Sequence, residues 1–293
     1  MKPEISIVTA TYNRAYILPE AINSVRNQTF ENWEHIIVDD GSSDNTPEIV
    51  SEYMKGDSRI RYLKLEKNVG QGEAMNRGIK EANTPLIAFI DSDDELHPEY
   101  LNNQIFFFKE NPEMGLCYVG ADYYRNNKLT HIVHPQVSGK LEEFLFTNLK
   151  GLGSSSSITV QKFVFDKAGT FDTKMPSQKD LDFLVRAARY FSIGYINDCN
   201  TKMRLDSDNR ISDNAKSIIE GEIMFFNKYE SRIKELGLYH HVSRKLARKY
   251  ALYQKNLPMA YRYLLKSIKS NPFYIYAYVY ALKLPILYFK RKI

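Results

Sequence analysis

The sequence predicts an α/β fold in which a mostly parallel central sheet is flanked by helices. Four short apolar runs in the first 90 residues, rich in β-branched and aromatic side chains, have the length and composition of buried strands. Helical patterns separate these runs, and strands that alternate with helices at this spacing favour βαβ units. The polar segments that follow the strands then lie at the edge where open α/β sheets bind their ligands.

The predicted elements follow one another in a regular order. The strands are expected at residues 5–10, 34–38, 60–65 and 86–90, and the helices at about residues 15–27, 46–55 and 71–82. Asp44 or Asn45 is a candidate N-cap of the second helix, because both side chains accept hydrogen bonds from a helix's first turn. A chain of 293 residues is long enough for one large α/β domain with an appendage.

The most informative junction lies at the end of the fourth predicted strand. Asp91, Asp93 and Asp94 place three carboxylates within four residues there. Clustered carboxylates repel one another and stay ionised together only when a cation lies among them. Their oxygens select hard cations such as Mg²⁺, Mn²⁺ or Ca²⁺, and an Mg²⁺-like ion held by one or two carboxylates usually completes its shell with substrate phosphates. The junction therefore predicts a metal-assisted site for a phosphorylated ligand.

Two earlier strands end in comparable polar segments. The first breaks into residues 11–14, where Tyr12 can offer a ring face to a nucleobase or, alternatively, pack under the sheet. The second ends at Asp39 and Asp40, followed by a glycine. Gly41 tolerates a positive φ and so permits a tight turn that aims the two carboxylates. An ordinary solvated turn is the alternative interpretation of this segment.

Together, these segments resemble the ordered motifs of the inverting glycosyltransferases of family 2, of the type that builds bacterial surface polysaccharides. The matching segments are residues 9–14, 38–44, 68–70 with 76–78, and 89–94. The resemblance is specific because four motifs agree in residue type, order and spacing, whereas any one alone would be weak. It covers about residues 3–215 and implies the GT-A fold, which is Rossmann-like.

The resemblance also implies a domain organisation. We expect a nucleotide-sugar-binding half at residues 1–98, an acceptor-binding half at residues 99–215 and a basic, Tyr-rich helical region at residues 216–293. Residues 151–157, Gly-Leu-Gly-Ser-Ser-Ser-Ser, have the composition of a linker. The strand-like run 158–160 follows them directly, which favours a wall of small residues beside a ligand.

The resemblance assigns the donor site to the strand ends. The implied nucleotide contacts come from Thr9, Tyr12, Arg14, Asp39, Asp40, Arg77, Asp91 and Ser92. Asp39 can accept the imino hydrogen of a uracil, and Asp40 or Asp91 can accept ribose hydroxyls. Asp93 is the implied metal ligand, with Asp91 as a second candidate, and the sequence does not choose between Mn²⁺ and Mg²⁺. Arg77 can pair with the base or the diphosphate, or it is an ordinary helix-surface residue.

The catalytic base implied by the resemblance is Asp180, near the start of a predicted helix. Members of the family carry a Glu-Asp pair there, whereas this chain has Lys179 in place of the Glu. The departure weakens the assignment and leaves Asp182 as a substitute. An acid in a helix's first turn also interacts favourably with the helix dipole, which is the non-catalytic interpretation of both residues.

A second departure lies at Arg204 and Asp206. Relatives often have an Arg followed two residues later by a His that can reach the metal or the diphosphate, but here the second position is Asp206. An acid can still ligate a hard cation, although it cannot donate to a phosphate. We expect Arg204 to contact the diphosphate, with a surface ion pair as the alternative.

Charge is distributed unevenly along the chain. Of the 40 Lys and Arg residues, 12 lie in residues 236–293, which contain ten of the 21 tyrosines and no Asp or Glu. Tyrosine rings and basic side chains together suit the surface of an anionic membrane, which is therefore an expected partner of this region. Nucleic acid is not an expected partner, because no recognition motif accompanies the basic residues.

Residues 273–289 are apolar enough to raise the question of a membrane span. The run is shorter than a spanning helix and contains Lys283 and Pro285, so we expect it to lie at the membrane interface. The alternative is a helical hairpin, residues 257–270 and 273–287, that packs on the catalytic domain or on the second subunit of a homodimer.

The cysteines and the start of the chain indicate the cellular compartment of the protein. Cys117 and Cys199 lack the spacing of metal ligands and suggest no disulfide framework, which fits a reducing compartment. Met1 leads directly into the first predicted strand, so we expect no signal peptide. We therefore expect a cytoplasmic protein that is peripheral on the inner face of the cell membrane.

These features predict a metal-dependent, inverting glycosyltransferase that moves a hexosyl or N-acetylhexosaminyl group from a UDP-sugar to a hydroxyl of a glycan or lipid-linked glycan. A degenerate GT-A domain acting as an assembly partner at the membrane is the non-enzymatic alternative. A haloacid-dehalogenase-type phosphatase is less favoured, because Glu95 replaces its Thr or Val and the strand is not the first. A dinucleotide oxidoreductase is disfavoured because Met75 interrupts its glycine pattern.

Overall fold

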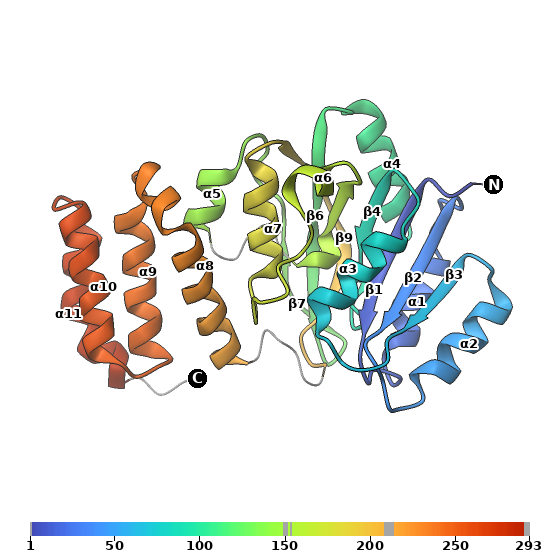
Figure 1. Ribbon diagram of the computed structural model, residues 1–293, viewed down its shortest axis with the longest axis horizontal. Helices are drawn as coiled ribbons and strands as arrows, with labels where there is room; N and C mark the ends of the chain where they lie inside the picture. Colours follow the sequence, from blue (N-terminus) through green and yellow to red (C-terminus); the bar gives the residue numbers. More distant parts are fainter. Residues whose placement is uncertain (1, 149–151, 153, 208–213, 290–293) are drawn as a thin grey trace. The chain divides into compact units, whose positions relative to one another are not determined.

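The protein forms two compact units in the computed structural model, which describes residues 2–148, 152, 154–207 and 214–289 (Figure 1). The first unit comprises Met1–Glu142, Lys150–Thr173 and Phe183–Asp208, and the second comprises Glu143–Leu149, Lys174–Asp182 and Asn209–Ile293. The domain boundaries predicted near residues 98 and 215 stay predictions.

A mixed β-sheet forms the centre of the first unit. Its strands follow the order β3-β2-β1-β4-β8-β6-β9-β5, and β7 pairs with β6. Their bounds are β1 Ile5–Thr11, β2 Trp33–Asp39, β3 Ile60–Lys64, β4 Leu86–Phe89, β5 Glu95–Leu96, β6 Met114–Arg125, β7 Lys128–Val133, β8 Ile158–Gln161 and β9 Ser192–Arg204. Strands β1 to β4 pair in parallel, whereas β8 runs antiparallel to both β4 and β6.

Helices flank this sheet, so the predicted α/β fold is confirmed (Figure 1). The helices of the first unit are α1 Leu18–Arg26, α2 Thr46–Gly56, α3 Gln71–Glu81, α4 Tyr100–Glu110 and α6 Val164–Ala168. Helix α7 Lys179–Ala188 begins in the second unit and continues in the first, and α5 Glu142–Thr147 lies in the second unit from Glu143 onward. The predicted cap of α2 comes from Asp44, whose Oδ1 accepts a hydrogen bond from the Thr46 N–H at 3.1 Å. Asn45 occupies the N-cap position but makes no capping bond with its side chain.

The alternation of side chains along β1 distributes them between two helical layers. Ile5 and Ile7 lie in a buried cluster with Leu18 of α1 and Leu101 of α4. Val8 points the other way and contacts α3. Because successive residues of a strand face opposite sides of the sheet, these contacts put α1 and α4 on one face and α3 on the other.

Gly78 allows α3 to lie very close to the sheet. A Cβ at this position would be 2.3 Å from Cγ1 of Val8 and 3.3 Å from Cγ2 of Val38. Both valines are fully buried in neighbouring parallel strands, so neither side chain has room to move away. The close packing also fixes where α3 begins, beside the carboxyl ends of β1 and β2.

The second unit contains four longer helices in the described part of the chain. They are α8 Ala215–Glu235, α9 Tyr239–Leu252, α10 Leu257–Ser270 and α11 Ile275–Phe289. Aromatic rings hold them together, since Phe226 of α8 packs against Tyr239 and Tyr263, and Tyr250 of α9 stacks on Tyr263 at 5.2 Å. The alternative of a helical hairpin at residues 257–270 and 273–287 matches the bounds of α10 and most of those of α11. None of the described helices is both long and apolar enough to cross a bilayer.

We predict that Gly78→Ala destabilises the protein by about 1–3 kcal/mol, because the added methyl overpacks the contact between α3 and the sheet. Chemical denaturation measures the effect. Gly56→Ala at the end of α2 is the matched control, since a Cβ there meets nothing within 4 Å. It should be neutral or stabilising by up to about 1 kcal/mol. Equal stability of the two variants would contradict the described packing of α3.

Candidate active site

The parallel strands bring three polar segments to one edge of the sheet. Thr11 is in register with Asp39, so the segments after β1 and β2 begin side by side. The Asn13 N–H donates to Oγ of Ser42 at 2.9 Å across these segments. Nη1 of Arg14 lies 3.5 Å from Oδ2 of Asp93, which follows β4. The predicted convergence of these strand ends is therefore observed.

Asp39 lies fully buried at the end of β2. Its Oδ1 accepts the Ser42 N–H at 2.8 Å, and its Oδ2 accepts the hydroxyl of Tyr62 from β3. Burial and this bond to a carboxylate raise the pKa of Tyr62, so the hydroxyl stays protonated and remains a donor. Asp39 is thus held in one orientation from two sides.

Asp40 connects the turn after β2 to the start of α3. Its two carboxylate oxygens accept the N–H groups of Val69 and Gly70 at 2.7 and 2.8 Å. Burial raises the pKa of Asp40, while these two bonds act in the opposite direction. The intervening Gly41 has a φ of 78°, and a Cβ there would be 2.7 Å from the backbone carbon of Lys67. The expected positive φ is therefore observed, and the turn packs directly on the loop before α3.

Asp91 lies between α3 and the 3₁₀ turn Ser155–Ser157. Its Oδ1 accepts bonds from Nε2 of Gln71 at 3.1 Å and from Oγ of Ser155 at 3.0 Å. Its N–H donates to Oγ of Ser156 at 2.9 Å. Ser155 to Ser157 are buried, so this part of the predicted small-residue wall borders the site. Gly151 and Gly153 of that wall lie outside the described residues.

Asp94 is the buried member of the acidic cluster, to which the sequence pattern assigned no individual contact. It accepts bonds from Oγ of Ser156 at 2.7 Å and from the Arg204 N–H at 3.1 Å. Burial raises its pKa well above the ordinary value, and the neighbouring Asp91 and Asp93 add to the effect. Asp94 therefore fastens the end of β9 to the end of β4.

Asp93 presents a carboxylate whose chemistry fits a hard divalent cation. Its Oδ2 lies near Arg14 and accepts a hydrogen bond from Ser207, a residue that the sequence pattern did not single out. Asp206, the alternative metal ligand, instead accepts the Asn126 N–H at 2.7 Å. The described residues contain no cluster of three or more His, Cys, Asp or Glu side chains suited to a metal. This donor set suits an ion that takes one or two carboxylates and completes its shell with phosphate and water.

The remaining predicted nucleotide contacts differ in their exposure. Tyr12 is 44% exposed, so its ring face is accessible to a base. Thr9 and Ser92 are buried, and the Thr9 hydroxyl is 2.9 Å from Nε2 of His35 inside the sheet. Arg77 lies on the surface of α3 and pairs with Glu73 at 2.9 Å, one turn away. Contact of these side chains with a nucleotide stays a prediction.

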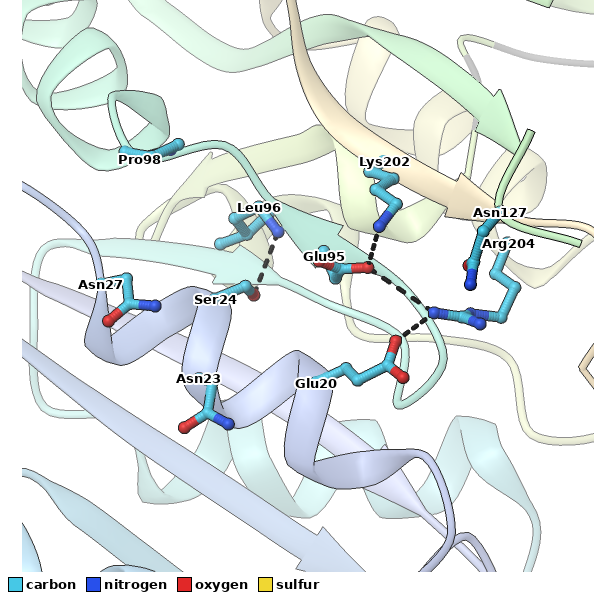
Figure 2. Close-up of a pocket in the computed structure, with 10 residues that line it drawn as sticks. All are labelled: Glu20, Asn23, Ser24, Asn27, Glu95, Leu96, Pro98, Asn127, Lys202 and Arg204. Carbon is cyan, nitrogen blue, oxygen red and sulfur yellow. Dashed lines mark hydrogen bonds and ion pairs between the residues drawn. The ribbon is translucent and has the colours of Figure 1, made fainter. Parts of the chain in front are cut away.

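Arg204 lines a polar pocket of about 560 Å³ between α1, β5 and β9 (Figure 2). Its guanidinium contacts Glu20 and lies 3.7 Å from Oε1 of Glu95, which also pairs with Lys202 at 2.6 Å. The ion pair that the sequence offered as the alternative is therefore present. A contact between Arg204 and a diphosphate stays a prediction.

The two candidate bases lie in the first turn of α7, in different environments. Asp180 is partly buried, and burial raises its pKa although Lys179 acts in the opposite direction. Asp182 is fully buried, where its Oδ1 lies 2.6 Å from Nζ of Lys228 and 2.8 Å from the Tyr229 hydroxyl. Asp182 thus connects the start of α7 to α8 through an ion pair with Lys228 and a hydrogen bond from Tyr229.

We predict that Lys228→Met destabilises the protein by about 3 kcal/mol, because it removes the ammonium group from a buried carboxylate. Lys234→Met on the same helix is the matched control, since Lys234 pairs with a partly exposed Glu230 at 3.0 Å. The control substitution should lower the free energy of unfolding by less than about 1 kcal/mol. Denaturant titration compares the two variants, and similar losses would contradict the structural role assigned to Asp182.

Comparison with known proteins shows the family to which this arrangement belongs. Residues 6–169 match the family model described as "Glycosyl transferase family 2". The chain is 30% identical over 219 residues to TuaG of Bacillus subtilis, named as a teichuronic acid biosynthesis glycosyltransferase, and the match covers 73% of this chain and 83% of TuaG. The match to EpsH of the same organism is 32% identical and covers 50% of this chain but only 46% of EpsH.

Solved structures share the fold. Residues 1–349 of TarS from S. aureus, in complex with UDP-GlcNAc, align with a TM-score of 0.68 at 19% identity, over 99% of this chain and 87% of that one. The mannosyltransferase PcManGT from Pyrobaculum calidifontis, in complex with GDP-Man and Mn²⁺, aligns with a TM-score of 0.63 at 13% identity, over 99% and 82% of the two chains. The chain has the GT-A fold of these enzymes, and by its sequence it belongs to glycosyl transferase family 2.

Proposed function

We propose that this glycosyltransferase moves a hexosyl or N-acetylhexosaminyl group from a UDP-sugar to a hydroxyl of a glycan or lipid-linked glycan, with inversion at the anomeric carbon. The enzyme would take part in the assembly of cell-surface polysaccharide or glycolipid. The convergence of Asp39, Asp91 and Asp93 on one edge of a parallel sheet is the observation that carries the proposal. It supplies acceptors for a nucleoside next to a carboxylate suited to a metal-bound diphosphate.

The donor side is assigned from the chemistry of the strand ends. Asp39 uses part of its accepting capacity on Ser42 and Tyr62, and a carboxylate has about four lone-pair sites, so it can also accept an imino hydrogen. Tyr12 offers an exposed ring to the base. The UDP-GlcNAc complex of TarS supports a uridine donor, whereas PcManGT binds GDP-Man. Thymine and guanine also carry an imino hydrogen, so the choice of uracil rests on the family resemblance and on the UDP-GlcNAc complex of TarS.

Asp93, with Asp91 beside it, would hold Mn²⁺ or Mg²⁺. When bound, the ion supplies Lewis-acid neutralisation of the negative charge on the leaving diphosphate. The Mn²⁺ complex of PcManGT supports this assignment. Arg14 adds a fixed positive charge next to Asp93, at 3.5 Å. Its guanidinium can contact phosphate oxygens that approach the carboxylate.

Asp180 is the proposed general base. It would accept the proton of the acceptor hydroxyl while that oxygen attacks the anomeric carbon from the face opposite the diphosphate. The bond from that carbon to the diphosphate oxygen breaks, and the nucleoside diphosphate leaves. A carboxylate whose pKa is raised by burial accepts a proton more readily than an exposed one. The buried contacts of Asp182 with Lys228 and Tyr229 favour Asp180 over it.

We place the protein at the cytoplasmic face of a membrane, bound peripherally through its basic C-terminal region, where a lipid-linked acceptor would be presented. One relative supports such an acceptor by its name, a GalNAc(5)-diNAcBac-PP-undecaprenol beta-1,3-glucosyltransferase from Campylobacter jejuni, which is 41% identical over 96 residues. The match covers 32% of this chain and 31% of that enzyme. A homodimer is compatible with this arrangement.

A catalytically degenerate GT-A domain that assists assembly is the second candidate. Lys179 in place of an acid, and Asp206 in place of a His, are the features that favour it. Metal-dependent hydrolysis of UDP-sugars in the absence of acceptor distinguishes the two, because a degenerate domain releases no UDP. Membership of family 2 leaves no support for the phosphatase alternative.

We predict that Asp180→Asn lowers sugar transfer by about 10²–10⁴-fold while nucleotide binding survives, because the amide cannot accept the proton. UDP release in the presence of a membrane extract as acceptor source measures transfer, and calorimetry measures binding. Asp166→Asn is the control, since Asp166 is an exposed acid in the first turn of α6. Near-normal transfer by Asp180→Asn would show that Asp180 is not the base.

A further inference from the structure

Helix α11 buries one side and leaves the opposite side uncovered in the described residues. Ala277 and Leu284 are fully buried where α11 packs on α9 and α10. Leu282 and Phe289 point away from this contact and are 80% and 79% exposed. Phe273, just before the helix, is 95% exposed. A helix that is apolar on both sides requires a second apolar partner.

The exposed side chains form one continuous face. They are Ile275, Val279, Leu282, Ile286 and Phe289, which we call the outer face of α11. Their spacing of three or four residues places them in a single stripe along the helix. Isolated apolar residues are normal on protein surfaces, but contiguous stripes of this kind mark sites of interaction.

The part of the chain that contains α11 is positively charged. Lys283 lies on α11 itself and is exposed. The Arg244 guanidinium is 4.8 Å from the Tyr280 ring, and Nζ of Lys255 donates to the Tyr288 carbonyl at 2.5 Å, both on the side of α11 that carries its buried residues. No Asp or Glu occurs anywhere in residues 236–293 to offset these cations. The apolar stripe therefore has Lys283 beside it and belongs to a region of the chain with positive net charge.

This combination selects among the partners that could cover the face. Pairing of two copies through the outer face would bring like charges together, which opposes association. An anionic lipid surface attracts the same charges and accepts apolar side chains between its headgroups. The exposed rings of Tyr276 and Tyr278 suit the headgroup level of such a surface. With 15 residues, α11 is long enough to lie in the interface but too short to span the bilayer.

We propose that α11 lies flat on an anionic bilayer, with its outer face among the headgroups and Lys283 beside it on the lipid phosphates. The proposal deepens the membrane-surface function given above and rests on it. It assigns the attachment to one helix face rather than to the basic region as a whole. This face would hold the chain at a bilayer that carries a lipid-linked acceptor.

Sedimentation with lipid vesicles tests the proposal on the full chain. We expect binding to vesicles that contain phosphatidylglycerol, and much weaker binding to vesicles of phosphatidylcholine alone. The double variant Leu282→Ser/Ile286→Ser should lose at least about tenfold in vesicle affinity, because two side chains no longer bury apolar area. Phe106→Ser, which alters an exposed apolar residue of α4, is the control and should bind like the unmodified chain.

Three outcomes would overturn the assignment. Equal binding of the double variant and the control would exclude the outer face as the contact. Equal binding to both kinds of vesicle would exclude the role of anionic lipid. A dimer in lipid-free solution that the double variant converts to a monomer, with no vesicle binding, would identify a second copy of the chain as the partner.

UDP-sugar hydrolysis without membranes separates this proposal from the catalytic one. The double variant should keep the hydrolysis rate of the unmodified chain, because neither substituted residue is assigned to the donor site or to catalysis. If the chain hydrolyses UDP-sugars but does not bind vesicles, the proposal for α11 is rejected and the proposed enzymatic function is retained. Vesicle binding without hydrolysis would support the membrane face and reject the proposed enzymatic function.

Discussion

The hydrogen bonds that Asp40 accepts from Val69 and Gly70 hold the donor edge of this protein together. They fasten the loop before α3 to the turn after β2, at a glycine that has no room for a Cβ. Gln71, the first residue of α3, is thereby positioned to donate to Asp91 after β4. One buried carboxylate thus couples the ends of β2 and β4, although β1 lies between these strands in the sheet. The geometry of the proposed nucleotide site depends on this coupling.

Negative charge is concentrated at the same edge, and this charge determines which ligands the edge can bind. Three acids follow β4, and burial raises the pKa of Asp94, with the neighbouring Asp91 and Asp93 adding to the effect. Arg14 is too distant for a strong hydrogen bond to Asp93, so it offsets the charge only in part. A divalent cation and a diphosphate would balance the remaining charge. The far end of the chain has the opposite composition, with basic residues and no acids, which suits an anionic surface rather than an anionic nucleotide.

Local patterns predicted the donor half well because its strands are short, apolar and followed by polar turns. Strands β6, β7 and β9 were not predicted, since β7 is exposed along its whole length and β9 mixes polar and apolar residues. Contacts between distant residues were also beyond local patterns. Ser207 reaches Asp93 across 114 positions, and Arg204 reaches Glu20 across 184. Nothing in the local sequence around Asp182 indicated that its side chain is buried against α8.

Calorimetric titration of UDP, dTDP and GDP, with and without Mn²⁺, tests the central claim most directly. We expect that UDP binds best, that Mn²⁺ strengthens binding, and that Asp93→Ala removes the metal dependence. Asp166→Ala, which alters an exposed acid of α6, should bind like the unmodified chain. Absence of nucleotide binding under every condition would contradict a donor site at this edge. Metal-independent binding that Asp93→Ala leaves unchanged would contradict the role of Asp93.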